Sequence, residues 1–209
     1  MIEQGSEEWF AARLGKITSS RIKDVMAKGR SGAVSATRKN YLTELLCQRL
    51  TGQREEGFTS GAMQRGTDME PLARAAYEVS LDAMVTEAAF ILHPDHEFTG
   101  SSPDGYVGDD GLIEIKCPNT ATHIACIQSC SHDKKYEWQM QHQMFCTGRQ
   151  WCDFASFDDR LPESLQLFIS RVNRDEDKIK IMTEEIQMFE DELQALQAEM
   201  LNMMEKGNE

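Results

Sequence analysis

The stretch that decides the fold is "SSPDGYVGDDGLIEIKCP", residues 101–118. It places Asp104 between a proline and a glycine, and it places Glu114 and Lys116 inside a short apolar run. The turn signal "GDDG" at residues 108–111 joins two strands into a hairpin. Because side chains alternate along a strand, Glu114 and Lys116 share one face, and Asp104 can lie opposite Glu114 on the neighbouring strand.

Two carboxylates side by side repel each other unless a cation lies between them. Hard oxygen ligands with positions left open for water are typical of Mg²⁺ and Mn²⁺ sites. A lysine on the same face can hold a metal-bound water or help to deprotonate it. The acids and the lysine of this stretch therefore predict a metal site folded across a hairpin. The alternative is an exposed hairpin with scattered charges.

Helical and strand patterns surround this hairpin in a regular order. Helices are predicted over residues 6–15, from about 18, and over 35–52, 67–80 and 135–148; strands are predicted over 84–92, 98–108, 111–117 and 151–158. The first three strands form a predicted meander. Pro71 is tolerated only in the first turn of its helix, and Trp9 is expected in the core. The order predicts an α/β (α+β) fold with a mixed central sheet flanked by helices.

The chain from residue 163 to residue 209 is predicted to form one long helical extension, which follows a domain over residues 1–162. Apolar residues there alternate at spacings of three and four, which is a heptad pattern. This seam can pack on the helix's own domain or form a coiled coil with another subunit or a partner. Its members are Ile179, Met182, Ile186, Phe189, Leu193, Leu196, Met200 and Met203.

Composition excludes several classes of protein. The 209 residues are 40% hydrophobic and hold no run of about 18 apolar residues, so no membrane span is predicted. The net charge is −13, but residues 1–50 carry nine Lys and Arg against five Asp and Glu, a local excess of +4 that can attract phosphate. The N-terminus lacks a signal-peptide pattern, and the six cysteines form no CxxC pair. We therefore expect reduced thiols in a cytoplasmic protein.

The spacing PD–x9–E–x–K resembles the PD-(D/E)XK nuclease superfamily. Three further blocks resemble those of the phage lambda exonuclease group, the YqaJ-like viral recombinases: "RLGKITSS" (13–20), "RGTDMEP" (65–71) and "WQMQHQMF" (138–145). The blocks stand in the order expected for that group, and the resemblance covers about residues 5–160. It implies a PD-(D/E)XK restriction-endonuclease-like core in residues 1–162.

The resemblance also implies an activity. Members of this group use Mg²⁺ to digest one strand of linear double-stranded DNA from its 5′ end. They release mononucleotides and leave 3′ single strands for recombination by single-strand annealing. They form a ring of three subunits and accompany a phage-type annealing protein. They need no ATP, and this chain has no GxxxxGK[ST] phosphate loop.

Specific residues match the functional positions of the group. Asp104 and Glu114 match two metal ligands, the backbone carbonyl of Ile115 completes that set, and Lys116 matches the catalytic lysine. Glu70 matches a glutamate that supports a second metal, with Asp68 as its nearest rival on the same helix. The residues that match or adjoin the DNA and 5′-phosphate contacts are Arg13, Ser20, Ser102, Gln139 and, as a possible neighbour of the metal site, Gln141.

Three alternatives stay open from the sequence. A restriction-like or repair endonuclease on the same fold would cut circular DNA as well. An iron–sulfur nuclease is disfavoured because Cys126, Cys130, Cys146 and Cys152 fit no cluster spacing. A non-catalytic assembly or DNA-binding protein is disfavoured because a binder gains nothing from repelling acids beside DNA.

Overall fold

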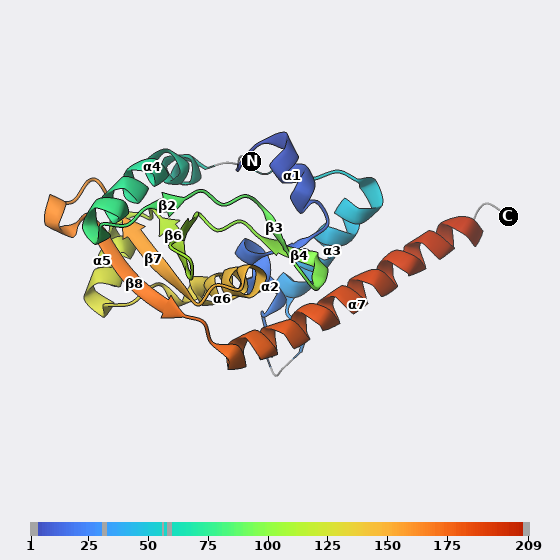
Figure 1. Cartoon of the computed structure of the whole chain (residues 1–209). Helices are drawn as coiled ribbons and strands as arrows, with labels where there is room; N and C mark the ends of the chain where they lie inside the picture. The colour runs from blue at the N-terminus through green and yellow to red at the C-terminus, as the bar shows by residue number, and fades with distance from the viewer. Residues whose placement is uncertain (1–3, 31–32, 56, 58–59, 207–209) are drawn as a thin grey trace.

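The structure, a computed structural model, describes residues 4–30, 33–55, 57 and 60–206. Its centre is a five-stranded mixed sheet in the order β2-β5-β6-β7-β8 (Figure 1). The strands β6 and β7 are parallel, and the other neighbours are antiparallel. The bounds are β2 Val85–Thr86, β5 Gly105–Val107, β6 Gly111–Lys116, β7 Trp151–Phe157 and β8 Leu167–Asn173. A smaller sheet has the order β1 (Ile17–Thr18), β4 (His96–Ser101), β3 (Ile91–His93).

Helices cover both faces of the large sheet. On one face, Ile113 and Ile115 of β6 pack in a cluster with Tyr77 of α4 (Gly61–Leu81). On the other face, Leu112 packs against α5 (Thr120–Ser129) and α6 (Glu137–Thr147), and Glu114 points the same way. The alternation of side chains along β6 therefore sends its apolar residues to both layers and its acid towards α6.

A second core joins the two ends of the chain. It lies between α2 (Ile22–Val25), α3 (Ala36–Thr51) and the C-terminal helix α7 (Glu176–Lys206). The side chain of Ser35 caps α3, and Gly52 ends it in the left-handed conformation. Ahead of them lie α1 (Glu7–Arg13) and the 3-10 turn η1 (Ser19–Arg21); two further 3-10 turns are η3 (Lys134–Tyr136) and η4 (Glu163–Leu165).

The predicted fold class is confirmed, but the predicted meander is wrong. Only its last hairpin, β5 with β6, forms as expected. Residues 84–92 and 98–108 each divide between the two sheets instead of forming single strands. Pro103 accounts for the second division, because proline has no N–H to donate to a ladder. The chain leaves the small sheet before Pro103 and enters the large sheet after Asp104.

Two predicted helix boundaries are also wrong. The helix α4 begins at Gly61, capped by Ser60, so Pro71 lies inside it rather than in its first turn. The helix predicted from residue 163 begins only at Glu176. Residues 167–173 form β8, which pairs with β7 along its whole length and extends the sheet beyond residue 162. Pairing covers the edge of β7, which would otherwise be left with unpaired backbone groups.

The heptad seam of α7 packs mainly on its own domain. Its members from Ile179 to Leu193 are buried, and Leu196 packs partly buried against the same core. Farther along, Met203 is 57% exposed, and Figure 1 shows the C-terminal end of α7 extending past α3. A contact of this distal end with another chain stays a prediction.

The six cysteines are unpaired in the structure. Within the described ranges, no helix combines the length and the apolar character needed to cross a membrane.

We expect Phe189→Ala to lower the free energy of unfolding by about 3–5 kcal/mol, because this fully buried ring packs beside Tyr41 of α3. Met203→Ala, at the exposed end of α7, is expected to change it by less than about 0.5 kcal/mol. Urea unfolding followed by circular dichroism measures both. Equal losses in the two variants would contradict the packing of α7 on its own domain.

Candidate active site

The centre of the site is the carboxylate of Glu114, which is fully buried in β6. Its Oε1 accepts a hydrogen bond from Gln139 Nε2 at 2.5 Å and pairs with the ammonium group of Lys116. Its Oε2 accepts a hydrogen bond from Gln143 Nε2 at 2.5 Å. Gln139 and Gln143 lie one turn apart on α6, so one helix face holds both oxygens.

Asp104 lies in the link between the two sheets and points at the same strand. Its Oδ2 accepts a hydrogen bond from the backbone N–H of Ile115 at 2.6 Å. Burial raises the pKa of Asp104 well above its usual value, and the nearby carboxylate of Glu114 raises it further. Burial alone would lower the pKa of Lys116, but the charges of Glu114 and Asp104 raise it above its usual value. The predicted meeting of these three groups is therefore observed.

Glu70 of α4 faces this group from the other side. Its negative charge also raises the pKa of Asp104. Two adjoining hollows of about 610 and 450 Å³ are both lined by Glu70 and Asp104, and Lys116 lines the second. The rival Asp68 is exposed, accepts a hydrogen bond from Gln64 and lines neither hollow. The structure therefore brings Glu70 to the site, where Arg74 Nη2 contacts its carboxylate at 3.2 Å.

The donor set fits a hard divalent cation. Within the described residues, no three His, Cys, Asp or Glu side chains form a ready-made metal-binding group. Two carboxylates that repel each other leave several positions for water, as Mg²⁺ prefers. Burial and the nearby carboxylate of Glu114 raise the pKa of Asp104, and a bound cation would favour its ionised form.

Arg13 forms the centre of a second polar group. Its Nη1 donates a hydrogen bond to Ser102 Oγ at 3.2 Å, and its guanidinium lies 3.9 Å from the centre of the Trp9 ring. The Trp9 indole N–H also donates to Ser102 Oγ, at 2.9 Å. Trp9 thus supports Arg13, and the expectation that it belongs to the core is wrong. Among the described residues Arg13 has no carboxylate partner, and burial lowers its pKa to about 10.

Ser20 lines the same hollow of about 420 Å³ as Arg13. It belongs to the short turn η1 ahead of α2, rather than to the first turn of a long helix. The neighbouring Ser19 is hydrogen bonded to His142 Nδ1 at 2.7 Å, which ties this turn to α6. Burial lowers the pKa of His142 to about 3, so the imidazole is neutral and structural.

The structure does not bring Gln141 to the acidic group. Its amide Nε2 donates to Asn173 O at 2.9 Å, and its Oε1 accepts from the backbone N–H of Asp175 at 3.0 Å. Gln141 therefore ties α6 to the link between β8 and α7, and we assign it no role at the acids. Sequence reasoning missed Gln143, although the helical spacing of four from Gln139 selects it. It also missed Tyr136, whose ring lies 5.3 Å from Lys116 Nζ.

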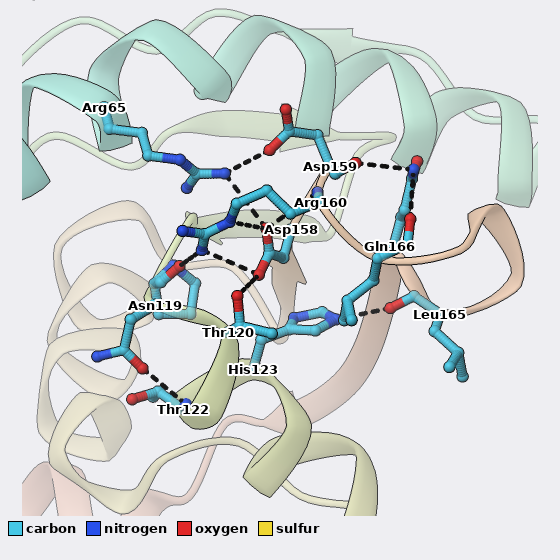
Figure 2. A network of polar contacts seen from close by, with 12 residues as sticks. Arg65, Asn119, Thr120, Thr122, His123, Asp158, Asp159, Arg160, Leu165 and Gln166 are labelled. Carbon is cyan, nitrogen blue, oxygen red and sulfur yellow. Dashed lines mark hydrogen bonds and ion pairs between the residues drawn. The ribbon is translucent and has the colours of Figure 1, made fainter.

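A buried carboxylate on the next strand fixes the segment that follows Lys116. Asp158 stands at the end of β7, and Figure 2 shows it surrounded by donors from three segments. Thr120 Oγ1 donates at 2.6 Å and Arg160 Nε at 2.7 Å, and Arg65 of α4 contributes an ion pair at 3.3 Å. Arg160 also donates to Pro118 O at 3.3 Å. The network holds the start of α5, the Pro118 turn and α4 together beside the site.

Comparison with known proteins identifies the family of this chain. A family model of the YqaJ-like viral recombinase domain matches residues 8–150. The chain belongs to this family. A search of curated proteins gave no match.

Two solved exonuclease structures agree with the fold. An alkaline exonuclease, LHK-Exo from Laribacter hongkongensis, is 51% identical with a TM-score of 0.90, over 96% of this chain and 99% of that one. The same protein has also been solved in complex with dAMP. A phage-related exonuclease from Haemophilus somnus 129PT is 17% identical with a TM-score of 0.71, over 88% of this chain and 96% of that one, and it shows a shared fold.

We expect Asp104→Asn to stabilise the metal-free protein at pH 8. The folded-state pKa of Asp104 is raised, so the folded state binds a proton more readily than the unfolded chain, and stability falls as pH rises from about 4 through that raised value. Asparagine keeps an oxygen for the Ile115 N–H but carries no charge. In EDTA the Tm should rise by about 2–4 °C for each kcal/mol of repulsion removed.

The control for this experiment is the response to pH and to Mg²⁺. The Tm difference between the two proteins should shrink towards pH 4, and added Mg²⁺ should raise the Tm of the wild type but not that of Asp104→Asn. A variant that is less stable than the wild type in EDTA at pH 8 would contradict the repulsion between Asp104 and Glu114.

Proposed function

We propose that this chain is a Mg²⁺-dependent, ATP-independent exonuclease that digests linear double-stranded DNA in the 5′-to-3′ direction. It would release 5′-mononucleotides and leave 3′ single strands for recombination by single-strand annealing. Membership of the YqaJ-like family and a match of nearly the whole chain to an alkaline exonuclease support a nuclease of the lambda-exonuclease type. Mn²⁺ is expected to substitute for Mg²⁺, because it suits the same oxygen ligands.

The observation that carries this proposal is that the Arg13 group and the acidic group around Asp104 adjoin each other. Ser102, which contacts Arg13, stands two residues before Asp104. Trp9 lines both the hollow of Arg13 and the larger hollow of the acids, and Met63 lines the Arg13 hollow and the smaller acidic one. A terminal phosphate bound at Arg13 would therefore lie beside the acids, which is the arrangement that an enzyme cutting near a 5′ end requires.

The chain's own residues have separable roles in this proposal. Bound Mg²⁺, one or two ions held by Asp104, Glu114, the Ile115 carbonyl and Glu70, would supply the Lewis-acid chemistry of phosphodiester hydrolysis. Gln139 and Gln143 hold the Glu114 carboxylate in one orientation. Lys116, whose ammonium group pairs with Glu114, would donate to a phosphate oxygen or to water.

Arg13 gives the reaction its direction. A planar guanidinium donates two parallel hydrogen bonds to a phosphate, and this one has no carboxylate to compete for them in the described part of the chain. Ser20 and Ser102 offer hydroxyl groups beside it. From the family resemblance we further propose a ring of three subunits and a phage-type single-strand annealing protein as partner. The six unpaired cysteines support the proposal of a cytoplasmic location.

The first test compares linear duplex DNA bearing 5′-phosphates with closed circular DNA in the presence of Mg²⁺. We expect mononucleotides from the linear form alone, and a loss of at least about a hundredfold in rate for Asp104→Asn and for Lys116→Ala. Release of acid-soluble nucleotide measures the rate, and EDTA should abolish it. Cutting of the circle would favour a restriction-like or repair endonuclease, and full activity of Asp104→Asn would exclude this site.

The second test addresses the end-binding group. Arg13→Ala is expected to raise the KM for duplex with a 5′-phosphate by about tenfold or more, since a hydrogen-bonded charge contributes about 1.5–3 kcal/mol, while the Mg²⁺ concentration needed for half-maximal rate stays unchanged. Arg149→Ala is the matched control, because Arg149 also lies over an aromatic ring but contacts the turn at Gly108. Equal rates of the wild type on phosphorylated and hydroxyl ends would contradict the assignment.

A further inference from the structure

The turn between Arg13 and Ser20 is held at one glycine. Gly15 has a φ of +67°, and both of its backbone polar groups are bonded to the end of α3. Its N–H donates to Gln48 Oε1 at 2.9 Å, and its carbonyl accepts from Arg49 Nε at 3.0 Å. The Arg49 Cγ would lie only 2.9 Å from a Cβ at this position, so the side chain of Arg49 is packed directly on the turn.

Arg49 is itself fixed by the C-terminal helix. Its Nη1 and Nη2 donate to the two carboxylate oxygens of Glu190 at 2.8 and 2.6 Å. The side chains of Arg49 and Glu190 are only 15% and 3% exposed, and Gln194 donates to Glu190 as well. Because Nε bonds Gly15 while both terminal nitrogens bond Glu190, each of the three guanidinium nitrogens has a partner, and together these bonds fix the plane in one orientation.

We infer that Arg49, held by Glu190 of α7, sets the spacing between Arg13 and Ser20. Arg49 is thus a positioning residue for 5′-end recognition. This inference rests on the proposed function of the Arg13 group. The Ser20 end of the segment has its own anchor, the bond between Ser19 and His142. The Arg13 end lies two residues before Gly15, and its carbonyl accepts the N–H of Lys16 at 3.1 Å in the same turn.

The mechanism is a matter of preorganisation. A phosphate binds tightly when its donors stand at the right distance before it arrives, since a donor that must be ordered on binding loses part of the free energy gained. With Arg49 in place, the turn after Arg13 is locked to α3 and to α7. Without it, the Gly15 carbonyl loses its partner and the left-handed turn is free to relax.

The chain contains a matched control for this idea. Arg38 of α3 pairs with Glu192 of α7 at 2.5 Å, and its side chain is 10% exposed. It therefore joins the same two helices through a similarly buried guanidinium, although its partner Glu192 is 43% exposed where Glu190 is 3% exposed. Its described contacts are with Glu192, the ring of Phe189 and the capping Ser35, and none is with the Gly15 turn. Arg38→Ala should weaken the docking of α7 without touching the turn.

The experiment compares the wild type with Arg49→Ala, Arg49→Lys and Arg38→Ala. KM and kcat are measured with Mg²⁺ on linear duplex carrying either a 5′-phosphate or a 5′-hydroxyl, and the Tm of each protein is recorded. We expect Arg49→Ala to raise KM for the phosphorylated end about tenfold, to leave kcat within about twofold, and to bring the preference for phosphate close to one. Arg49→Lys should not rescue it, because one ammonium cannot bridge Gly15 and both Glu190 oxygens.

Arg38→Ala is expected to lower the Tm by less than Arg49→Ala, because Glu192 is more exposed than Glu190, and to keep the wild-type preference. An Arg49→Ala protein that loses Tm but keeps the preference would overturn the inference, and so would a loss of preference in both variants, which would point to α7 docking in general. If Arg49→Ala does not fold, Glu190→Gln takes its place and should reduce the preference by about half or more. A wild type that shows no preference for the 5′-phosphate would instead refute the proposed 5′-phosphate site at Arg13.

Discussion

The burial of one ionised side chain constrains most of this molecule. Glu114 lies in the middle of the central sheet with no exposed surface, where an unpaired carboxylate would cost several kcal/mol. Lys116 supplies the opposite charge, and Gln139 and Gln143 supply hydrogen bonds to both oxygens. These partners lock β6 against α6. The same contacts fix the carboxylate beside Asp104 and Lys116, which line the hollow that Glu70 also lines.

The break at Pro103 completes this arrangement from the other side. Because the chain changes sheets there, Asp104 stands outside both ladders and turns its carboxylate onto the N–H of Ile115. Ser102, just before the break, faces Arg13 and Trp9 instead. A single interruption of a strand thus places the carboxylate of Asp104 on one side and the hydroxyl of Ser102, bonded to Arg13, on the other.

Predictions from the sequence were correct where they depended on contacts between residues close together in the chain. Strand alternation and one turn signal were enough to bring Asp104, Glu114 and Lys116 together. Helical spacing separated Gln139 from Gln141, and the same rule would have added Gln143. The strand β8 was missed because an isolated edge strand of mixed polarity carries a weak pattern and becomes stable only when β7 lies beside it. Trp9 was misassigned because a large aromatic ring is typical of a core, whereas its indole N–H donates to Ser102 instead.

By itself, the sequence determined the fold class, the acid and lysine positions on one strand, and the blocks that resemble the family, because each strand, helix and block is encoded within about twenty consecutive residues. Only the tertiary structure brought the C-terminal helix α7, through Arg49, to the turn at Gly15. Arg49 and Glu190 stand 141 residues apart, and no local pattern connects them. Their pairing follows from the shared apolar core of α3 and α7, which places the two side chains opposite each other. Two buried charges are stable there only because each faces the other.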